Sequence, residues 1–320
     1  TLLNTNAITL GNVVAFVEYL FHVMMSVLIF CMVFMMYPRA NVSAKRIMEV
    51  LDTKPSIVND KDCIQLDSIQ TLRFKDVSFS YSNGEEAVLK NIDFSCHKGQ
   101  KIAVIGSTGS GKSTLVKLMN RFYDVSRGSI EINGIDIRKY DLESLRAQIG
   151  YVAQKAHMFK GSIRSNICFG KPEASDEEMH HAATVAQASD FISKREHGYE
   201  DEIAEDGTNI SGGQKQRLSI ARVILKKPSL YIYDDSFSAL DFKTDATLRK
   251  ALKPEVKDAI FFVVAQRIST IMDSDMIIVL DEGQIIGLGT HLELLKNCSV
   301  YQEIAHSQLT QKELDDYERN

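Results

Sequence analysis

Residues 101–113 read KIAVIGSTGSGKS, and this stretch decides the fold. Its first five residues form a short apolar strand, and residues 106–113 match the phosphate-binding pattern GxxxxGKS, which needs a strand before it and a helix after it. The residues that follow carry apolar side chains at helical spacing, namely Leu115, Leu118, Met119 and Phe122. The order of strand, glycine-rich loop and helix predicts an α/β P-loop fold that binds a nucleoside triphosphate.

The residue types of this loop suit a triphosphate and its metal ion. Glycines allow consecutive backbone N–H groups to turn toward phosphate oxygens, and the N-terminus of the next helix adds its positive end. In this pattern Lys112 reaches the terminal phosphates and the hydroxyl of Ser113 binds Mg²⁺. The predicted nucleotide ligands are Gly106, Ser107, Thr108, Gly109, Ser110, Gly111, Lys112, Ser113 and Thr114.

A second apolar run, Leu230–Tyr233, predicts a strand that ends in the acids Asp234 and Asp235. A carboxylate at this place can hold the Mg²⁺ shell opposite Ser113, and we assign this role to Asp234. A plain structural strand that ends in two acids is the alternative interpretation. Residues 210–214 read ISGGQ before a predicted helix, so small residues and free N–H groups at a helix N-terminus indicate a second phosphate-binding site.

Residues 13–37 form the most apolar stretch, VVAFVEYLFHVMMSVLIFCMVFMMY. At about 1.5 Å per residue a helix of this length crosses a bilayer, so we interpret it as a transmembrane helix rather than a buried core helix. The basic residues Arg39, Lys45 and Arg46 follow the run, unlike those of a signal peptide, and place its C-terminal side in the cytoplasm.

Glu18 and His22 are the strongly polar side chains of this run, and their spacing puts them on one helix face. We interpret them as a pair near the outer headgroups, and a polar site that faces a cavity within the membrane is the alternative.

These patterns divide the chain into four segments. They are residues 1–52 with the membrane helix and its cytoplasmic extension, a polar linker at 53–70, a nucleotide-binding domain at 71–308 and a polar tail at 309–320. The domain opens with the alternating sequence TLRFKDVSFSY, which predicts a strand over residues 71–81 followed by a turn at Ser82-Asn83-Gly84.

The composition excludes several classes of protein. Hydrophobic residues make up 44% and charged residues 25%, as in ordinary globular proteins. The 37 Lys and Arg residues are outnumbered by 42 Asp and Glu residues, so we expect no nucleic-acid partner. The five cysteines form no CxxC pair, which argues against a zinc site and a disulfide framework and favours a reducing compartment.

Taken together, the motifs resemble those of the ATP-binding cassette (ABC) ATPases, and more closely the ABC exporters that fuse membrane helices to the cassette. Residues 106–113 are similar to the Walker A motif, Gln154 to the Q-loop, and Ser211, Gly212, Gly213 and Gln214 to the signature motif. Asp234 matches the Walker B aspartate and residues 238–241 the D-loop. The resemblance implies an α/β, ABC-type P-loop NTPase with a β-rich subdomain, a RecA-like core and a helical subdomain, preceded by one transmembrane helix.

The resemblance also implies ligands, partners and a location. Tyr81 stands where the family places an aromatic ring that stacks on adenine, with a core strand tyrosine as the alternative, and Glu205 resembles a loop that crosses the exporter interface. ATP and Mg²⁺ are the expected cofactors, and Gln154 coordinates the Mg²⁺ shell. Because the chain begins at Thr1 with one span, we expect a longer, multi-pass protein of the cell membrane with a cytoplasmic ATPase domain, in contact with lipid and a transported small molecule, lipid or peptide.

Two residues depart from the family pattern. The family has Glu after the Walker B aspartate and a His about thirty residues later, whereas this sequence has Asp235 and Gln266. With Gln154, these are the predicted catalytic residues, and the two departures predict a site that binds ATP but hydrolyses it poorly. The intact signature at residues 211–214 predicts a heterodimer in which this chain completes the active site of a second exporter subunit. A homodimeric exporter with slow symmetric sites and a soluble, non-transport ABC ATPase are the alternatives.

Overall fold

The computed structural model describes residues 9–81 and 86–309. The predicted turn at Ser82-Asn83-Gly84 and most of the predicted tail therefore lie outside the described residues. The chain divides into two compact units, Thr1–Ser56 and Ile57–Asn320.

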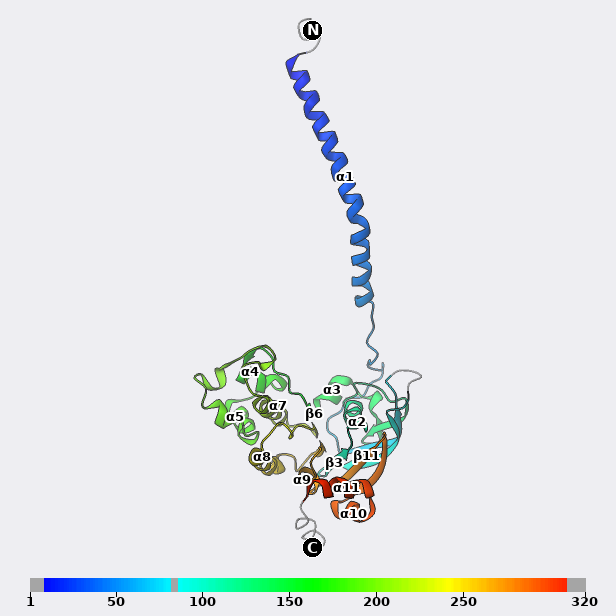
Figure 1. The fold of residues 1–320 in the computed structure, drawn as a ribbon, viewed down its shortest axis with the longest axis vertical. Helices are drawn as coiled ribbons and strands as arrows, with labels where there is room; N and C mark the ends of the chain where they lie inside the picture. The colour runs from blue at the N-terminus through cyan, green and yellow to red at the C-terminus, as the bar shows by residue number, and fades with distance from the viewer. Residues whose placement is uncertain (1–8, 82–85, 310–320) are drawn as a thin grey trace. The chain divides into compact units, whose positions relative to one another are not determined.

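The first unit consists, within the described residues, of the helix α1 (Leu10–Leu51) (Figure 1). Thr9 caps it by accepting a hydrogen bond from the N–H of Asn12, and the helix continues through Pro38 without a break. The predicted span and the helical segment after it thus form one element. None of its residues is buried, and it is the one helix in the described ranges that is long and apolar enough to cross a membrane.

A six-stranded sheet forms the centre of the second unit, in the order β12-β11-β3-β10-β9-β6. Its strands are β3 (Lys101–Gly106), β6 (Ile149–Val152), β9 (Leu230–Asp234), β10 (Ile260–Val264), β11 (Met276–Asp281) and β12 (Gln284–Gly289). All neighbours pair in parallel except β12, which is antiparallel to β11. Every residue of β9 and β10 is buried, which explains why both strands read as uninterrupted apolar runs.

A four-stranded antiparallel sheet, in the order β2-β1-β4-β5, packs on this centre. Its strands are β1 (Thr71–Phe79), β2 (Leu89–His97), β4 (Arg127–Ile132) and β5 (Ile135–Asp136). Phe94 of β2 stacks on Phe74 of β1 and also on Phe262 of β10, which joins the two sheets. The strand predicted to reach Tyr81 ends at Phe79, because pairing with Leu89 stops there and the Tyr81 hydroxyl instead contacts Thr114.

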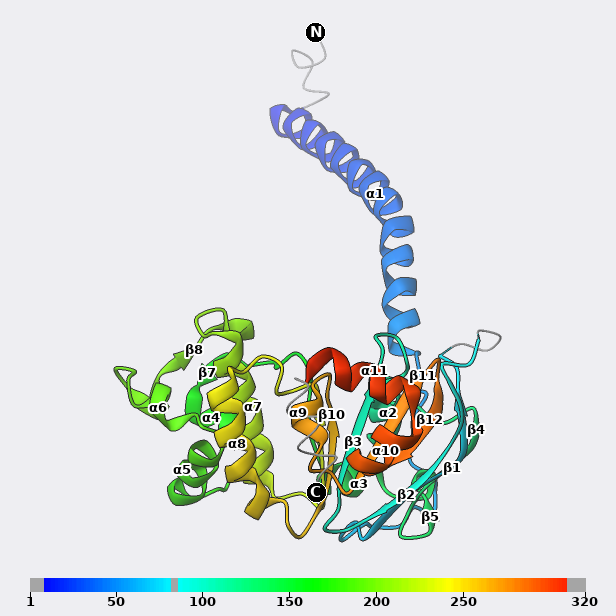
Figure 2. The ribbon, with the colours of Figure 1, turned by 60° about the horizontal axis from the view of Figure 1, so that its bottom comes forward.

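Short helices cover the central sheet and gather beside it (Figure 2). The α-helices are α2 (Lys112–Met119), α3 (Leu142–Ala147), α4 (Ile163–Ile167), α5 (Asp176–Val185), α6 (Ser189–Ile192), α7 (Gly212–Lys226), α8 (Phe242–Glu255), α9 (Ile268–Ile271), α10 (His291–Asn297) and α11 (Ser299–Gln308). Four 3-10 turns (Ile137–Lys139, Cys168–Gly170, Gly198–Glu200 and Glu205–Gly207) and the strand pair β7 (Gly161–Ser162) and β8 (Glu202–Ile203) complete the described elements. Helices α4 to α7 form a helical lobe around α7.

The sequence predicts that four residues after the phosphate loop share one apolar helix face, and the structure confirms this for three of them. Leu115, Leu118 and Met119 of α2 are buried, but the prediction for Phe122 is wrong. The helix ends before Phe122 because Arg121 adopts a positive φ of 47°, and Phe122 is 42% exposed.

Residues 57–70, which belong to the linker predicted at 53–70, are part of the second unit and pack on the rest of it. Leu66 and Ile69 are buried there, and Ile64 forms a β-bridge with Tyr140. Polar contacts with the start of α3 also hold this segment, including the hydrogen bond that the amide of Asn59 donates to Asp141 (2.7 Å). Such contacts depend on partners far along the chain, so the polar composition of the segment does not reveal them.

Gly128 and Gly134 provide a matched test of the β1–β4 pairing. Both have φ near +80°, where alanine costs about 1–2 kcal/mol. A Cβ at Gly128 would lie 2.4 Å from the main-chain oxygens of Lys75 and Asp76, whereas nothing lies within 4 Å of a Cβ at Gly134. We therefore expect Gly128→Ala to lower the melting temperature at least twice as far as Gly134→Ala, as measured by circular dichroism of the chain in detergent. Equal shifts would contradict the described register.

Candidate nucleotide-binding site

Four parallel strands end at one edge of the central sheet. The phosphate loop follows β3, Asp234 ends β9, Val264 ends β10, and Gln154 follows β6 by two residues. Val264 pairs with Val104 of β3 on one side and with Asp234 on the other, so segments far apart in the sequence meet here. The carboxyl ends of parallel strands are where open α/β sheets bind their ligands.

The glycines of the phosphate loop make its tight turn possible. Gly109 and Gly111 have φ angles of 87° and 100°, which side chains with a Cβ rarely adopt. A Cβ at Gly111 would also lie 2.6 Å from Leu89 Cδ2. Gly111 stands at the N-cap of α2, where no side chain of the described residues caps the helix, so its first N–H groups face the loop.

The ammonium group of Lys112 closes the loop from inside. It donates to the main-chain oxygens of Gly106 (3.0 Å) and Ser107 (2.6 Å) and lies 3.4 Å from the hydroxyl of Ser110. Burial lowers the pKa of Lys112, and the nearby carboxylates of Asp235 and Asp234 oppose this shift. A phosphate group offers stronger acceptors for these N–H donors than main-chain carbonyls do.

Ser113 and Asp234, which are predicted to hold Mg²⁺ together with Gln154, lie next to each other. The Ser113 hydroxyl lies 3.4 Å from Asp234 Oδ1, and the Tyr151 hydroxyl lies 3.5 Å from Asp234 Oδ2. Burial raises the pKa of Asp234, and the bond from Ser113 opposes the rise. Mg²⁺ is typically bound through one or two carboxylates together with phosphate oxygens. The oxygen donors here fit such an ion, and the described part of the chain has no group of three His, Cys, Asp or Glu that could hold a metal alone.

Asp235 receives both predicted catalytic amides on one oxygen. Gln266 Nε2 donates to Asp235 Oδ2 at 2.7 Å, and Gln154 Nε2 donates to the same oxygen at 3.1 Å. The backbone of Asp235 has a positive φ of 49°, and its N–H donates to the carbonyl of Val264. Burial raises the pKa of Asp235, and the hydrogen bond from Gln154 is the largest effect that opposes it. The three residues therefore form one hydrogen-bonded cluster in the described structure.

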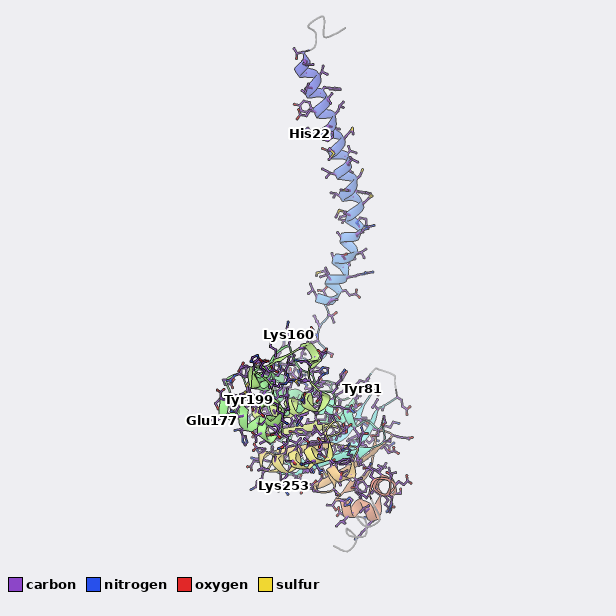
Figure 3. The ribbon with its side chains drawn as sticks, turned by 60° about the vertical axis from the view of Figure 1, so that its left-hand side comes forward. His22, Tyr81, Lys160, Glu177, Tyr199 and Lys253 are labelled. Carbon is purple, nitrogen blue, oxygen red and sulfur yellow. The ribbon has the colours of Figure 1, made fainter. Side chains whose placement is uncertain are left out.

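Tyr81 stands beside this site and contacts the helix that follows the phosphate loop. Its hydroxyl lies 3.0 Å from that of Thr114, and Phe79 and Tyr123 contact its ring edge-on. The ammonium group of Lys117 lies 5.5 Å from the ring centre. Tyr81 is 40% exposed, so aromatic surface remains accessible next to the phosphate loop (Figure 3).

Most of the predicted site residues line one pocket of about 230 Å³. The lining residues are Val88, Thr108, Gly109, Gly111, Lys112, Ser113, Thr114, Gln154, Asp234, Asp235, Val264 and Gln266. Gly106, Ser107 and Ser110 form the inner side of the loop, where they contact Lys112. The structure thus brings the phosphate loop, the acid pair and both glutamines together.

The predicted signature residues lie elsewhere, at the start of α7. The hydroxyl of Ser211 accepts from the N–H of Gln214 (3.3 Å), and the side chain of Gln214 accepts from the N–H of Ser211 (3.0 Å). These bonds differ from the prediction that the N–H groups here are free, because the side chains form a capping box. A Cβ at Gly213 would lie 3.2 Å from the carbonyl of Ala239, so Gly213 permits close approach to residues 238–241.

Two further predicted segments flank these elements. The hydroxyl of Ser238 donates to the carbonyl of Asp235 (2.7 Å), and Asp241 caps α8 by accepting from the N–H of Thr244 (3.0 Å). Glu205 lies in an exposed 3-10 turn that Lys215 of α7 holds by donating to the carbonyl of Asp206 (2.7 Å). Both segments therefore have defined local contacts.

Comparison with known proteins agrees with this geometry. Residues 89–238 match the family described as ABC transporter. The structure is similar to that of a bacterial Atm1-family ABC exporter with ATP bound, with a TM-score of 0.85 and 32% identity over 95% of this chain and 53% of that chain. The nucleotide-binding fold is therefore of the ABC type.

Two sequence relatives are similar to this chain over more than nine-tenths of its length. An uncharacterised ABC transporter ATP-binding protein of Mycobacterium tuberculosis is 40% identical over 311 residues, which are 96% of this chain and 53% of that protein. A putative multidrug export ATP-binding/permease protein of Bacillus subtilis is 40% identical over 298 residues, which are 93% of this chain and 51% of that protein. The chain thus spans about half the length of these relatives.

The ABC-type site contains residues that the sequence analysis missed. Tyr151 contacts Asp234, and Val88 and Val264 line the pocket. Tyr151 lies one residue before the end of β6, and only the parallel pairing of β6 with β9 brings it to Asp234. No motif marks these three residues. Strand register was the signal that could have found Tyr151 and Val264, whereas Val88 lies just before β2 and has no such signal.

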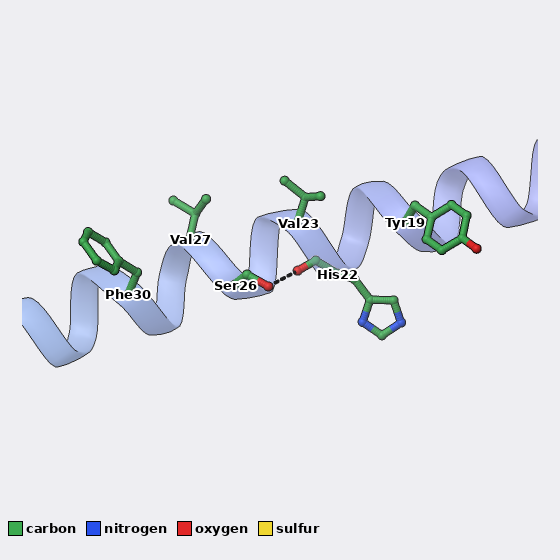
Figure 4. Close-up of a pocket in the computed structure, with 6 residues that line it drawn as sticks. All are labelled: Tyr19, His22, Val23, Ser26, Val27 and Phe30. Atoms are coloured by element: carbon green, nitrogen blue, oxygen red, sulfur yellow. Dashed lines mark hydrogen bonds between the residues drawn. The ribbon is translucent and has the colours of Figure 1, made fainter.

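A shallow groove of about 570 Å³ lies along α1, outside the ABC-type domain. Figure 4 shows Val23 and Val27 on one side of the helix and His22 on another, with the Ser26 hydroxyl bonded to the carbonyl of His22 (2.8 Å). Glu18 Oε1 and His22 Nε2 lie 3.9 Å apart, in agreement with the prediction that the two side chains share one helix face. The groove is one side of a single helix, so by itself it encloses no ligand.

Lys112→Ala is expected to weaken ATP binding by about 10- to 100-fold, because a charge-assisted hydrogen bond contributes about 1.5–3 kcal/mol. Isothermal titration of the chain in detergent with ATP and Mg²⁺ measures the change. Lys98→Ala removes an exposed lysine outside the site and serves as the control. Equal affinities for the two variants would show that the pocket is not the ATP site.

Asp235→Asn is expected to raise the melting temperature at pH 7.5 in the absence of nucleotide. Because burial raises the pKa of Asp235, the ionised carboxylate destabilises the folded chain at a pH above that pKa. As the pH falls through the raised pKa the carboxyl becomes protonated, so the difference from the unmodified chain should narrow. Asp62→Asn, at an exposed position, is the control. A stabilisation that does not depend on pH would refute this account.

Proposed function

We propose that this chain is the ATP-binding part of a membrane ABC exporter, which couples ATP binding and hydrolysis to the export of a small molecule, lipid or peptide. The observation that carries the proposal is the meeting of Lys112, Ser113 and Asp234 at one pocket of an ABC-type fold. The exposed apolar surface of α1 and the relative named as an export ATP-binding/permease protein support a membrane role.

The proposed roles follow the four segments of the sequence. Residues 1–52 belong to the membrane domain, with residues 13–37 as its last transmembrane helix, and residues 53–70 connect them to the rest. Residues 71–308 are the ATPase domain on the cytoplasmic side of the cell membrane, followed by the tail at 309–320. Relatives about twice as long as this chain support its assignment to a multi-pass transporter subunit.

We assign the residues of the pocket to the parts of Mg²⁺-ATP. Lys112 and the backbone N–H groups of the phosphate loop hold the terminal phosphates, and Tyr81 presents its ring to the adenine base. Ser113 and Asp234 hold the ion, with Gln154 at its shell. Bound Mg²⁺ would supply charge neutralisation on the phosphate oxygens. In the described structure Lys112 donates to carbonyls of its own loop, and we expect phosphate oxygens of bound ATP to replace these carbonyls as acceptors.

We further propose that this site binds ATP well and hydrolyses it slowly. The carboxylate of Asp235 is one methylene shorter than that of Glu, and a displacement of about 1 Å can cost ~10²-fold in rate. Both glutamine amides donate to Asp235 Oδ2, so this oxygen is engaged before any water molecule reaches it. Gln266 carries no positive charge and cannot exchange a proton as an imidazole does.

A heterodimer explains how such a subunit contributes to turnover. Residues 211–214 do not line the pocket of the described chain, so we propose that they complete the nucleotide site of a second exporter subunit. That subunit in turn covers the pocket of this chain with its own signature. Turnover then arises mainly at the site that holds the partner's catalytic base. A stable dimer of this subunit alone with brisk ATPase activity would instead favour a homodimer.

The segment after Gln154 is the proposed link to the membrane domain. Phe159 is 49% exposed and stacks on Phe169, with Arg222 beside both rings. Gln154 lines the nucleotide pocket and is five residues before Phe159. A movement of Gln154 on nucleotide binding can therefore shift the exposed aromatic pair. We propose that this surface rests against the cytoplasmic ends of the membrane helices.

Restoring the family residues tests the proposal of slow hydrolysis. The variant Asp235→Glu with Gln266→His is expected to raise the ATPase rate of the purified subunit about 10- to 100-fold, because a positioned base contributes about 10²–10⁴-fold. The ATP affinity should change less than threefold. Steady-state phosphate release and titration with ATP measure the two quantities.

Controls separate the causes of this gain. The two single variants show how much of the gain in ATPase rate comes from Glu at position 235 and how much from His at position 266. The triple variant that adds Lys112→Ala should lose the gain, because the gain requires this chain's own pocket. A melting temperature near that of the unmodified subunit shows that the variants fold. An unmodified subunit as fast as the double variant would show that Asp235 and Gln266 suffice for catalysis.

A further inference from the structure

A second cavity, of about 570 Å³, lies at the end of the central strands opposite the nucleotide pocket. It is bounded by the start of β3 at Lys101, by Asp273 and Asp275 before β11, and by the C-terminal half of α8. Leu252 and Phe261 give it an apolar floor. We call it the basic cavity.

The charges deep in the basic cavity are already paired. The ammonium group of Lys101 forms an ion pair with Asp273 and donates to the carbonyl of Thr270 (3.1 Å). Asp275 accepts from the N–H of Lys101 (2.7 Å). Arg249 lies 3.0 Å from Asp245 of the same helix. Asp273 is therefore paired with an ammonium group, whereas Asp275 keeps its charge. The lining as a whole carries more basic than acidic side chains, because Lys101, Arg249 and three further lysines face these two acids.

Three lysines at the outer rim have different surroundings. Lys250, Lys253 and Lys257 line the cavity and are exposed, and Figure 3 labels Lys253. No carboxylate of residues 9–81 or 86–309 forms an ion pair with any of them. The rim therefore presents a net positive surface above an apolar floor, which suits an acidic segment that also carries apolar side chains.

We propose that residues 310–320 of this chain dock in the basic cavity. The segment reads TQKELDDYERN, and its acidic residues are Glu313, Asp315, Asp316 and Glu318. They outnumber its two basic residues and complement the rim lysines. Leu314 and Tyr317 supply apolar surface for the floor of the cavity. The proposal concerns a surface apart from the nucleotide site and does not rest on the proposed function.

The place where the described chain ends supports this docking. The side-chain amide of Gln308, at the end of α11, donates to the carbonyl of Gln266 and accepts from the N–H of Ile268, both at 2.8 Å. The next two residues of α9 contact cations of the cavity. The carbonyl of Ser269 accepts from Arg249 (2.8 Å), and that of Thr270 accepts from Lys101 (3.1 Å). Figure 2 shows α9 between α8 and α11.

The tail therefore starts within one short helix of the cavity. Its residues can extend to about 36 Å at ~3.3 Å per residue, and a tether this short gives an effective concentration in the mM range. Docking would join α8, which begins after Asp241, to α9 beside Gln266. The docked tail would thus contact two helices that follow the D-loop segment and Gln266, respectively.

Zero-length carbodiimide cross-linking of the intact chain, followed by mass spectrometry, tests the docking. Tail carboxylates are expected to cross-link to Lys250, Lys253 and Lys257 at least fivefold more often than to Lys296, an exposed lysine of the neighbouring α10. The excess should fall in 0.5 M NaCl, because screening weakens pairing between exposed charges. Equal cross-linking to Lys296, or none to the cavity lysines, would overturn the proposal.

A charge swap supplies the second test. The double variant Lys253→Glu with Lys257→Glu should reduce the cross-links between tail carboxylates and Lys250 at least fivefold. Adding Asp315→Lys with Asp316→Lys should restore contact between tail and cavity, seen as cross-links between the new tail lysines and the new glutamates at 253 and 257. All four positions lie outside the proposed nucleotide site, so ATP binding should be unchanged and serves as the control for folding. Failure of the swap to restore contact, with ATP binding intact, would refute charge pairing as the cause of docking.

Discussion

Two carboxylates buried side by side at the end of β9 set the central constraint on this structure. Asp234 and Asp235 are 4% and 8% exposed, and burial raises the pKa of each. Charged groups in such a place need donors, which must come from other strands. The loop after β3 brings Lys112 and Ser113, and the loops after β6 and β10 bring two glutamines. Because these four strands run in parallel, their following loops meet at one edge of the sheet and supply the donors that stabilise the two buried carboxylates.

The same constraint suggests why hydrolysis would be slow in the proposed function. The two amides that stabilise Asp235 as a carboxylate both engage Oδ2, which leaves Oδ1 as the oxygen with fewer donors to act as a general base. An amide at position 266 stabilises the charge without supplying one of its own. In the proposed heterodimer this arrangement favours retention of ATP, while residues 211–214 serve a site elsewhere. Binding and turnover are then divided between two subunits.

Local sequence predicted the phosphate loop, the strand before Asp234 and the apolar helix α1, because each has a strong pattern of its own. It was wrong for Phe122, because the backbone turn at Arg121 ends the helix and no residue type in the sequence marks that turn. Contacts with distant residues could not be predicted either, such as the hydrogen bond that Asn59 of the predicted linker donates to Asp141. The motifs also indicated which residues meet in the pocket, but the shared oxygen of Asp235 depends on strand register.

The most direct measurement of the central claim is the steady-state ATPase rate of this subunit assembled with a second exporter subunit that has Glu and His at the two positions. One complex carries Asp235→Asn, and the other carries a neutral replacement of the partner's catalytic base. We predict that the first retains most of the activity and that the second loses it. Loss of most activity with Asp235→Asn, and its retention when the partner's base is replaced, would contradict the account.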